Sequence, residues 1–201
     1  MPEITSVPIL ILAAGRSRRM RGQDKLLEDV DGLPLLRRQI EMAQGTGQPV
    51  FVAVPPDAIA RRAIIDESKA TALIVADADE GLSASLRSGV AQLPDAPAFL
   101  VMLGDLVALE TADLVAVLDA RNAAPDALIW RGTTADRKPG HPILFDASLR
   151  PDFAGLAGDK GADALVKKHT GATHFVALPD ARARFDLDTP EDWDAWRLTR
   201  T

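Results

Sequence analysis

The chain has 201 residues, of which 47% are hydrophobic and 26% are charged, and its formal net charge is −6. This composition is typical of a globular protein with an apolar core, and the acidic balance argues against non-specific binding to nucleic acid. There is no cysteine, so disulfides, thiolate metal ligands and thiol catalysis are excluded. The first residues lack the basic start of a signal peptide, and no apolar run reaches the length of a membrane span. We therefore expect a cytoplasmic protein without a nucleic-acid or membrane partner.

Apolar runs typical of strands alternate with helical patterns through the first half of the chain. The predicted strands lie at 7–12, 49–54, 73–76 and 98–103. The predicted helices lie at 34–43, after 57, from 81 to 93 and at 111–120. In the second of these helices we expect Asp57 as the N-cap, with Ile59, Ala63 and Ile64 facing inward.

The second half of the chain is less regular. Strands are expected at 127–130, 143–145 and 173–178, with a loop at 132–142 and a helix at 162–168. A final helix begins with Thr189 as its N-cap and Pro190 in its first turn, and Trp193 and Trp196 are expected to pack it onto the body. Strand–helix alternation predicts a single three-layer α/β/α domain over residues 1–201, Rossmann-like, with a mostly parallel central sheet.

A turn of small residues, followed by basic residues, comes directly after the first predicted strand. The small residues are Ala13, Ala14 and Gly15, and the cations that follow are Arg16, Arg18, Arg19, Arg21 and Lys25. Small side chains let backbone N–H groups approach a phosphate, and the cations can neutralise its charge. The Walker pattern and the glycine-rich dinucleotide fingerprint are both absent. Our hypothesis is that this segment holds the triphosphate of a nucleotide, and the alternative is a solvated basic patch.

Asp105 follows the apolar strand at 98–103, directly after Gly104. Ligands of open parallel sheets bind at the carboxyl ends of the strands, so Asp105 is expected at the same edge as the small-residue turn. Mg²⁺ prefers one or two carboxylates together with phosphate oxygens and water. Asp105 is therefore a candidate Mg²⁺ ligand, and the alternative is an acid that caps a helix.

Five segments of the chain resemble one known family. They are LAAGRSRRM-RGQ-DKLL, GLSASLRSG, the LGD that ends at Asp105, GHPILF and DLDTPEDW, and they span residues 7–193. Together they resemble the MobA-like nucleotidyltransferases and, within them, the molybdenum cofactor cytidylyltransferase branch. The resemblance implies a nucleotide-binding half at about 1–110 and an acceptor-binding half at about 111–201. It also implies transfer of a nucleoside monophosphate from an NTP to a phosphorylated acceptor, with release of pyrophosphate and with Mg²⁺ as cofactor.

The resemblance further implies roles for single residues. The residues that would bind the nucleotide are Leu12, Ala13, Ala14, Gly15, Arg16, Lys25, Gly81 and Ser85. Arg16, Lys25 and Asp105 would be catalytic: Arg16 and Lys25 would stabilise charge on the α-phosphate and the departing pyrophosphate, and Asp105 would act by binding Mg²⁺. Asp105 and Asp188 would hold Mg²⁺, with Asp186 as the nearest competitor of Asp188.

The acceptor implied by the resemblance is molybdopterin. Its terminal phosphate is largely ionised near pH 7, because a phosphomonoester has a second pKa of about 6. An anionic nucleophile needs no general base, which agrees with the lack of any Ser-His-Asp pattern. Arg19 and His141 would contact the acceptor, and the alternative for His141 is a hydrogen-bonded turn histidine. The Asp159-Lys160-Gly161 segment would either contact the acceptor or begin a helix.

The chain departs from the family pattern after the candidate metal ligand. Relatives usually carry a proline two residues after this aspartate, whereas this chain carries Val107. Valine does not fix the backbone as proline does, which would loosen the acceptor site or indicate a different acceptor.

Three functions follow from these observations. The first is Mg²⁺-dependent transfer of CMP from CTP to molybdopterin, with a molybdoenzyme or its chaperone as a further partner. The second keeps the chemistry but transfers GMP, or uses a sugar or alcohol phosphate as acceptor. The third is a non-catalytic nucleotide- or cofactor-binding chaperone, against which the presence of both Asp105 and Lys25 argues. A nicotinamide oxidoreductase is disfavoured by the missing glycine fingerprint.

Overall fold

The computed structural model describes residues 6–158 and 161–199. Within these ranges, a seven-stranded sheet forms the centre of the fold. Its strands are β1 (Ile9–Leu12), β4 (Val50–Val54), β5 (Thr71–Ile74), β6 (Ala98–Leu103), β7 (Ile129–Thr133), β8 (Pro139–Asp146) and β9 (Thr173–Ala177). Their order is β5-β4-β1-β6-β8-β7-β9, and the neighbouring pairs are parallel except where β8 takes part. The short strands β2 (Asp29–Val30) and β3 (Leu33–Pro34) form a separate hairpin. The mostly parallel sheet predicted from the sequence is confirmed.

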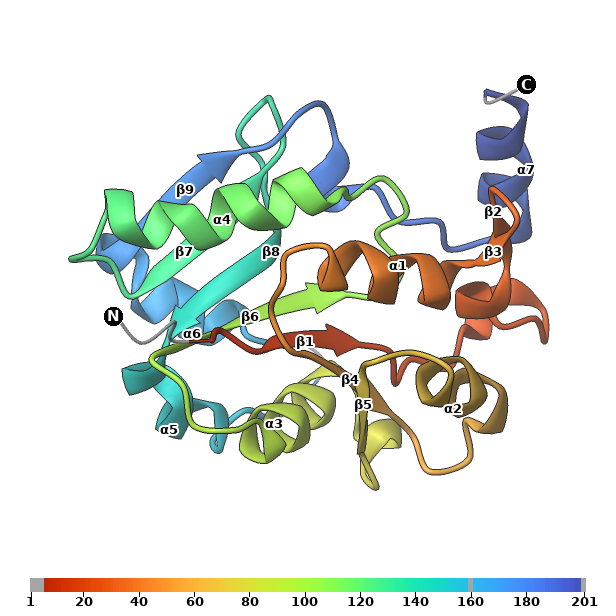
Figure 1. Cartoon of the computed structure of the whole chain (residues 1–201), viewed down its shortest axis with the longest axis horizontal. Coiled ribbons are helices and arrows are strands. Elements are labelled where there is room, and N and C mark those ends of the chain that lie inside the picture. Colours follow the sequence, from red (N-terminus) through yellow and green to blue (C-terminus); the bar gives the residue numbers. More distant parts are fainter. Residues whose placement is uncertain (1–5, 159–160, 200–201) are drawn as a thin grey trace.

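Helices cover both faces of this sheet and complete a three-layer arrangement (Figure 1). One face carries α1 (Leu35–Gln44), α2 (Ile59–Asp66), α4 (Thr111–Ala123) and α7 (Pro190–Leu198), and the other carries α3 (Leu82–Gln92), α5 (Arg150–Phe153) and α6 (Asp163–Lys168). Single 3₁₀ turns lie at Arg18–Met20, Lys25–Leu27, Ala78–Glu80, Ala147–Leu149, Thr170–Ala172 and Arg182–Arg184. The Rossmann-like α/β/α fold expected from the alternation of elements is therefore confirmed.

Strand β1 lies at the centre of the sheet, and its residues alternate between two cores. Ile9 and Ile11 pack on the side of α1, whereas Leu10 and Leu12 pack on the side of α3. All four are buried, which explains why the strand reads as a continuous apolar run. The neighbouring strand β6 ends in register with β1, so the residues that follow the two strands emerge side by side.

Helix α7 begins as the sequence predicts. The hydroxyl of Thr189 accepts a hydrogen bond from the backbone N–H of Asp192, and Pro190 occupies the first turn. Trp193 is buried and meets Trp196 edge to face, with ring centroids 5.8 Å apart. Figure 1 shows this helix beside the β2–β3 hairpin, although the two are far apart in the sequence.

The start of α2 differs from the prediction. The helix begins at Ile59, and Asp57 makes no cap, because its carboxylate pairs with Arg16 instead. Ile59 is 79% exposed, and the buried residues of the helix are Arg61 and Ile65. The inner face of the helix thus differs from the predicted one, and it carries the charged side chain of Arg61.

Other boundaries differ as well. Strand β5 begins at Thr71, two residues before the predicted start, and β8 begins at Pro139, so the loop before it is shorter than predicted. His141 therefore lies within a strand and not in a turn. Asp159 and Lys160, expected in a turn or at the acceptor, lie outside the described residues.

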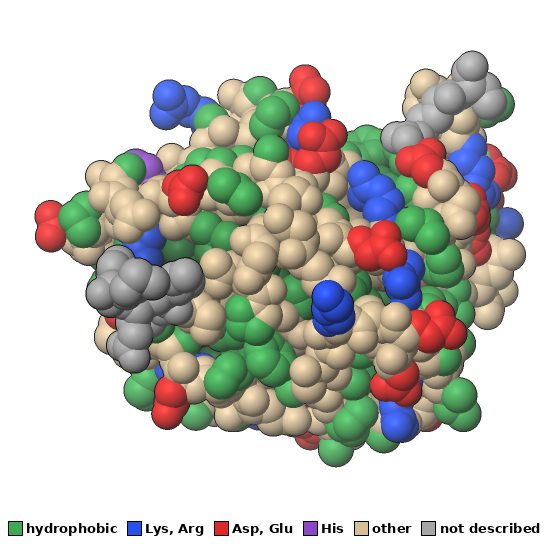
Figure 2. All heavy atoms as spheres, viewed as in Figure 1, with side chains coloured by type: hydrophobic (Ala, Val, Ile, Leu, Met, Phe, Trp, Pro, Cys, Tyr) green, Lys and Arg blue, Asp and Glu red, His purple; other side chains and the backbone are tan. Residues whose placement is uncertain are grey.

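Acidic and basic side chains mingle on the face shown in Figure 2, most densely on the side of α7, and neither sign forms a large patch there. Within the described ranges, none of the helices is both long enough and apolar enough to cross a bilayer.

Candidate active site

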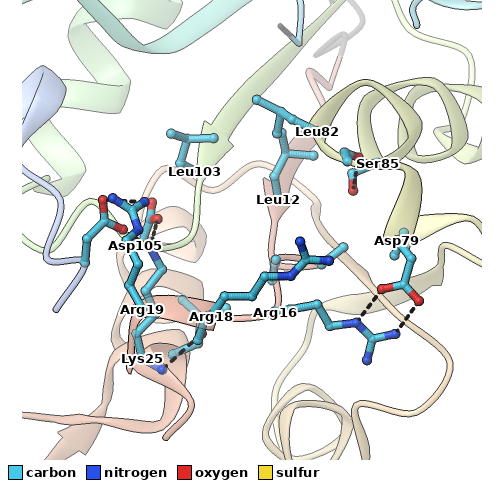
Figure 3. Close-up of a pocket in the computed structure, with 18 residues that line it drawn as sticks. Leu12, Arg16, Arg18, Arg19, Lys25, Asp79, Leu82, Ser85, Leu103 and Asp105 are labelled. Carbon is cyan, nitrogen blue, oxygen red and sulfur yellow. Dashed lines mark hydrogen bonds and ion pairs between the residues drawn. The ribbon is translucent and has the colours of Figure 1, made fainter. Parts of the chain in front are cut away.

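A cavity of about 400 Å³ opens at the carboxyl ends of β1 and β6. The sequence-predicted residues that line it are Leu12, Ala13, Ala14, Gly15, Arg16, Arg19, Lys25, Gly81, Ser85, Asp105 and Asp188. Of the predicted site residues, His141 lies elsewhere, in a second cavity. Figure 3 shows two charged groups in the first cavity, one around Lys25 and Asp105 and the other around Arg16 and Asp79.

The loop after β1 is held at both ends by one buried arginine. Arg61 of α2 is 5% exposed, and two of its nitrogens each lie 2.7 Å from an oxygen of Asp24. A third nitrogen donates to the carbonyl oxygen of Ala13 at 2.5 Å. The Asp24 carboxylate also accepts from the backbone N–H of Leu26, so it starts the 3₁₀ turn that carries Lys25. The loop is thus closed into a fixed arch between residues 13 and 24.

The backbone of this arch leaves open space toward a ligand. A Cβ placed on Gly15 would meet no described atom within 4 Å. Ser17 and Arg21 both adopt left-handed backbone conformations, with φ of 49° and 53°, which is uncommon for residues other than glycine. The hydroxyl of Ser17 accepts from the backbone N–H of Lys25 at 3.2 Å and helps hold this shape. Such a turn presents backbone donors to an anion.

Arg16 is held at one side of the cavity by two carboxylates. Its nitrogens lie 2.7 and 3.0 Å from the oxygens of Asp79 and 2.6 Å from Asp57 (Figure 3). Hydrogen bonds to Arg16 lower the pKa of both carboxyl groups, and the same bonds raise the pKa of the guanidinium. A triphosphate that binds Arg16 must therefore compete with two exposed acids.

Lys25 lies at the opposite side, between two acids. Its Nζ is 2.5 Å from Oδ2 of Asp105 and 2.8 Å from Oδ1 of Asp188. Burial alone would lower the pKa of Lys25, but the charge of Asp105 and the hydrogen bonds to both acids raise it. Arg19 pairs with the other oxygen of Asp188 at 2.7 Å.

Asp105, Asp186 and Asp188 form a cluster that could hold a metal ion. Each offers one oxygen, and these atoms lie within 4.8 Å of one another. Oδ1 of Asp105 is buried and has no hydrogen-bond partner among the described residues. Burial, together with the charges of Asp188 and Asp105, raises the pKa of Asp186. A buried unpaired carboxylate oxygen in a group of three acids fits a hard divalent cation. Asp186, ranked second from the sequence, thus lies with the two predicted ligands.

Helix α3 provides the wall opposite the acids. Gly81 precedes it with φ of 103°, a conformation that favours glycine, and Ser85 is 5% exposed on its first turn. Leu82, the first residue of this helix, is 37% exposed and lines the cavity. The start of α3 therefore presents both polar and apolar groups to a ligand.

The turn after Asp105 is fixed without the usual proline. Val107 is buried, and its carbonyl oxygen accepts from Arg38 of α1 at 2.8 Å. Gln39, from the same helix, donates to the carbonyl oxygen of Leu106 at 3.1 Å. Side chains of α1 thus hold the backbone that the sequence comparison suggested would be loose.

His141 points to the second cavity, which has a volume of about 290 Å³. Burial and the nearby charge of Arg131 lower the pKa of His141 to about 3, so the ring is neutral near pH 7. Three leucines, Leu12, Leu82 and Leu103, line both cavities. His141 therefore lines a different cavity from the charged groups around Lys25 and Arg16, and the two cavities share apolar wall residues.

Sequence reasoning missed the charged residues that shape the site. The position of Asp24 directly before Lys25 is only a weak indication of a role in the site. Arg61 has the sequence pattern of a solvent-facing residue on an amphipathic helix. Asp57 was interpreted as a cap, and Asp79 gave no signal. All four act through contacts between residues that are distant in sequence.

The fold and this site, in which a basic small-residue loop lies beside an acidic cluster, are typical of a nucleotide-dependent transferase. Residues 9–173 match the family described as MobA-like NTP transferase domain, and the chain belongs to this family of nucleotidyltransferases.

Two curated relatives match along nearly the whole chain. "Purine catabolism protein PucB" of Bacillus subtilis is 28% identical over 94% of this chain and 94% of its own length. "Molybdenum cofactor guanylyltransferase" of Shewanella halifaxensis is 28% identical over 92% of this chain and 90% of its own length.

A solved structure is also similar. Rv0371c of Mycobacterium tuberculosis has a TM-score of 0.83 and 29% identity, and the alignment covers 98% of this chain and 99% of that chain. A second structure of Rv0371c, a complex with manganese, has a TM-score of 0.78 at 26% identity over 95% of this chain and 97% of that chain.

Proposed function

We propose that this protein transfers CMP from CTP to the terminal phosphate of molybdopterin and releases pyrophosphate, with Mg²⁺ as its cofactor. The observation that carries the proposal is Oδ1 of Asp105, which is buried and has no hydrogen-bond partner among the described residues, and which lies in one cavity with the small-residue arch and its cations. The acids fit a divalent cation, and the arch fits a phosphate chain. The reaction needs the cation site and the phosphate-binding arch in one place, because the anionic triphosphate and the anionic acceptor phosphate must approach each other.

The residues of the chain have separate tasks in this proposal. The backbone of Ala13, Ala14 and Gly15 would donate to the phosphates, while Arg16 and Lys25 would balance the charge that moves onto the pyrophosphate. Gly81 and Ser85 would contact the base and ribose, as the family resemblance implies, and Leu12 would also contact the nucleotide. No side chain needs to remove a proton, since the attacking phosphate is already anionic.

Asp105, Asp186 and Asp188 would hold the cation. When bound, Mg²⁺ would neutralise phosphate charge and orient the reacting groups. The manganese complex of Rv0371c supports a divalent cation as cofactor, since Mn²⁺ and Mg²⁺ share a preference for oxygen ligands. Because Lys25 now occupies the space between two of these acids, we expect a cation to displace its ammonium group toward the phosphates.

Molybdopterin as the acceptor is supported by the printed name of the Shewanella relative. The same name favours a second candidate, transfer of GMP. The segments GLSASLRSG and GHPILF favour CMP, because they resemble the cytidylyl branch.

A panel of the four NTPs, each with Mg²⁺ and molybdopterin, tests the choice of base. We expect pyrophosphate release to be fastest with CTP. A preference for GTP would contradict the cytidylyl assignment and keep the mechanism. Nucleotide binding without pyrophosphate release, with any acceptor, would favour a non-catalytic binding protein.

A further inference from the structure

The second cavity adjoins the candidate active site, and of the residues that line it the proposed chemistry uses only Leu12, Asp186 and the shared wall of the first cavity. Leu12, Leu82 and Leu103 line both cavities, so a ligand can extend across them from one cavity to the other. Asp186 belongs to the acidic cluster and also lines the second cavity. One end of the second cavity therefore lies at the place where the reacting phosphates are proposed to meet.

The middle of this cavity is apolar. The side chains that form it include Leu86, Val101, Ile143, Phe145 and Val166. All five belong to the core on the α3 side of the sheet, and each is largely excluded from solvent. Such walls suit a flat or apolar molecular body.

Arg131 of β7 introduces a cation into this apolar wall. Its side chain is 14% exposed, and its Nε donates to the carbonyl oxygen of Gly140 at 3.0 Å. The carboxylate of Asp163 lies 3.8 Å away, beyond hydrogen-bond distance, and is itself 74% exposed. Burial is the main cause that lowers the pKa of Arg131. A buried cation with so distant a counter-charge retains donors for a ligand.

Arg184 brings a second guanidinium to the same cavity. It donates to the carbonyl oxygen of Pro139 at 3.2 Å, one residue before the carbonyl that Arg131 contacts. The two arginines are close enough for Arg184 to lower the pKa of Arg131 through charge repulsion. Two like charges at one place favour an oxygen-rich ligand group between them.

His141 completes this part of the wall. Its ring stays neutral because of burial and the charge of Arg131, so it offers one donor and one acceptor near pH 7. The cavity thus offers cations and a neutral imidazole in addition to its apolar walls and the acid shared with the metal cluster.

We infer that the second cavity binds the body of the acceptor, and that Arg131 and Arg184 bind oxygen acceptors at the end remote from its reacting phosphate. The inference rests on the proposed function and specifies its substrate class: a phosphate monoester with a flat, largely apolar body that carries oxygen groups. Short alcohol phosphates lack such a body, so the cavity discriminates against them.

The test is pyrophosphate release at saturating CTP and Mg²⁺ with varied molybdopterin, for Arg131→Gln and Arg184→Gln. We expect the KM for molybdopterin to rise about tenfold or more in the first variant and less in the second, whose residue is exposed. The KM for CTP should stay within about twofold of wild type. Arg37→Gln is the matched control, because Arg37 pairs with Glu41 on α1 and lines neither cavity. Arg131→Lys should not restore the KM, since a lysine lacks the planar fork.

Unchanged KM values for molybdopterin in both variants would overturn the inference and leave the proposed function standing. If the wild type turns over glycerol 3-phosphate as well as molybdopterin, the inference also fails. If the wild type releases no pyrophosphate with any acceptor, the proposed function fails. Titration with pterin-6-carboxylate then decides whether the second cavity is a binding site. Calorimetric binding that is lost in Arg131→Gln and kept in Arg37→Gln would support the cavity as a binding site, and no binding to wild type would overturn it. Because Arg184 is exposed, its variant keeps the test valid should Arg131→Gln fail to fold.

Discussion

Arg61 and Asp24 form a bidentate ion pair beneath the arch, with two N–O distances of 2.7 Å. The pair joins helix α2 to the residue before Lys25, and Arg61 also holds the carbonyl of Ala13. The position of the small-residue turn relative to Lys25 therefore depends on one buried side chain.

Replacement of Arg61 by methionine should destabilise the protein and loosen the arch. Loss of one partner of a buried pair costs about 3–5 kcal/mol, and we expect about 2–3 kcal/mol here because Asp24 is 27% exposed. Urea unfolding measures this loss, and calorimetry should show weaker CTP binding at a temperature where the variant is folded. Arg62→Met, a change at the exposed neighbour, is the control. CTP affinity equal to that of wild type in folded Arg61→Met would contradict the positioning role.

Asp57→Asn should lower the KM for CTP. The change removes one of the two carboxylates that hold Arg16 and leaves the first cavity intact, since Asp57 does not line it. Exposed ion pairs are weak because water screens them, so we expect a gain in affinity of about fivefold at most. Asp119→Asn, on the exposed face of α4, should leave the KM unchanged. A higher KM in Asp57→Asn would show that the acid helps to place Arg16 and does not compete with the triphosphate.

Lys25→Met should bind Mn²⁺ more tightly in the absence of nucleotide, yet lose turnover. The ammonium group now occupies the space between Asp105 and Asp188, so a cation must displace it. Removal of the ammonium leaves the acids with stronger net negative charge, while the phosphates lose a counter-charge. Titration of Mn²⁺ by electron paramagnetic resonance measures the first effect, and pyrophosphate release measures the second. Weaker Mn²⁺ binding in this variant would contradict the proposed competition.

His141 should make the native state sensitive to acid. The pKa of its ring is about 3 in the folded protein, against an ordinary value of 6.5. Between these values the unfolded chain binds one more proton than the native state, so the free energy of unfolding decreases as pH falls. The slope from this one residue is at most about 1.4 kcal/mol per pH unit.

His141→Gln removes that contribution. Urea unfolding of wild type and variant at pH 7, 6 and 5 should give curves of stability against pH that diverge below the ordinary pKa of histidine. The variant should lose less stability on acidification. Equal slopes would show that the His141 ring is protonated as readily in the folded protein as in the unfolded chain.

The sequence predicted most of the fold because its strands are continuous apolar runs, as at β1 and β6, and because Thr189 and Pro190 mark the last helix. The predicted residues that gather in the first cavity follow strand ends or begin a helix, where backbone geometry decides position. Arg61 could not be found in this way, because a buried arginine on a helix looks like a surface residue until its partner is known. The same holds for Arg131, whose role depends on the strand that packs beside it.

The central claim is that Asp105, beside the arch, serves a metal-dependent nucleotidyl transfer. The most direct measurement is pyrophosphate release from CTP with Mg²⁺ and molybdopterin, for wild type and for Asp105→Ala, with Asp126→Ala as an exposed control. We predict release by the wild type and the control, and a fall of about 10²-fold or more in Asp105→Ala without loss of folding. Undiminished release by Asp105→Ala, at the same Mg²⁺ concentration, would contradict the account.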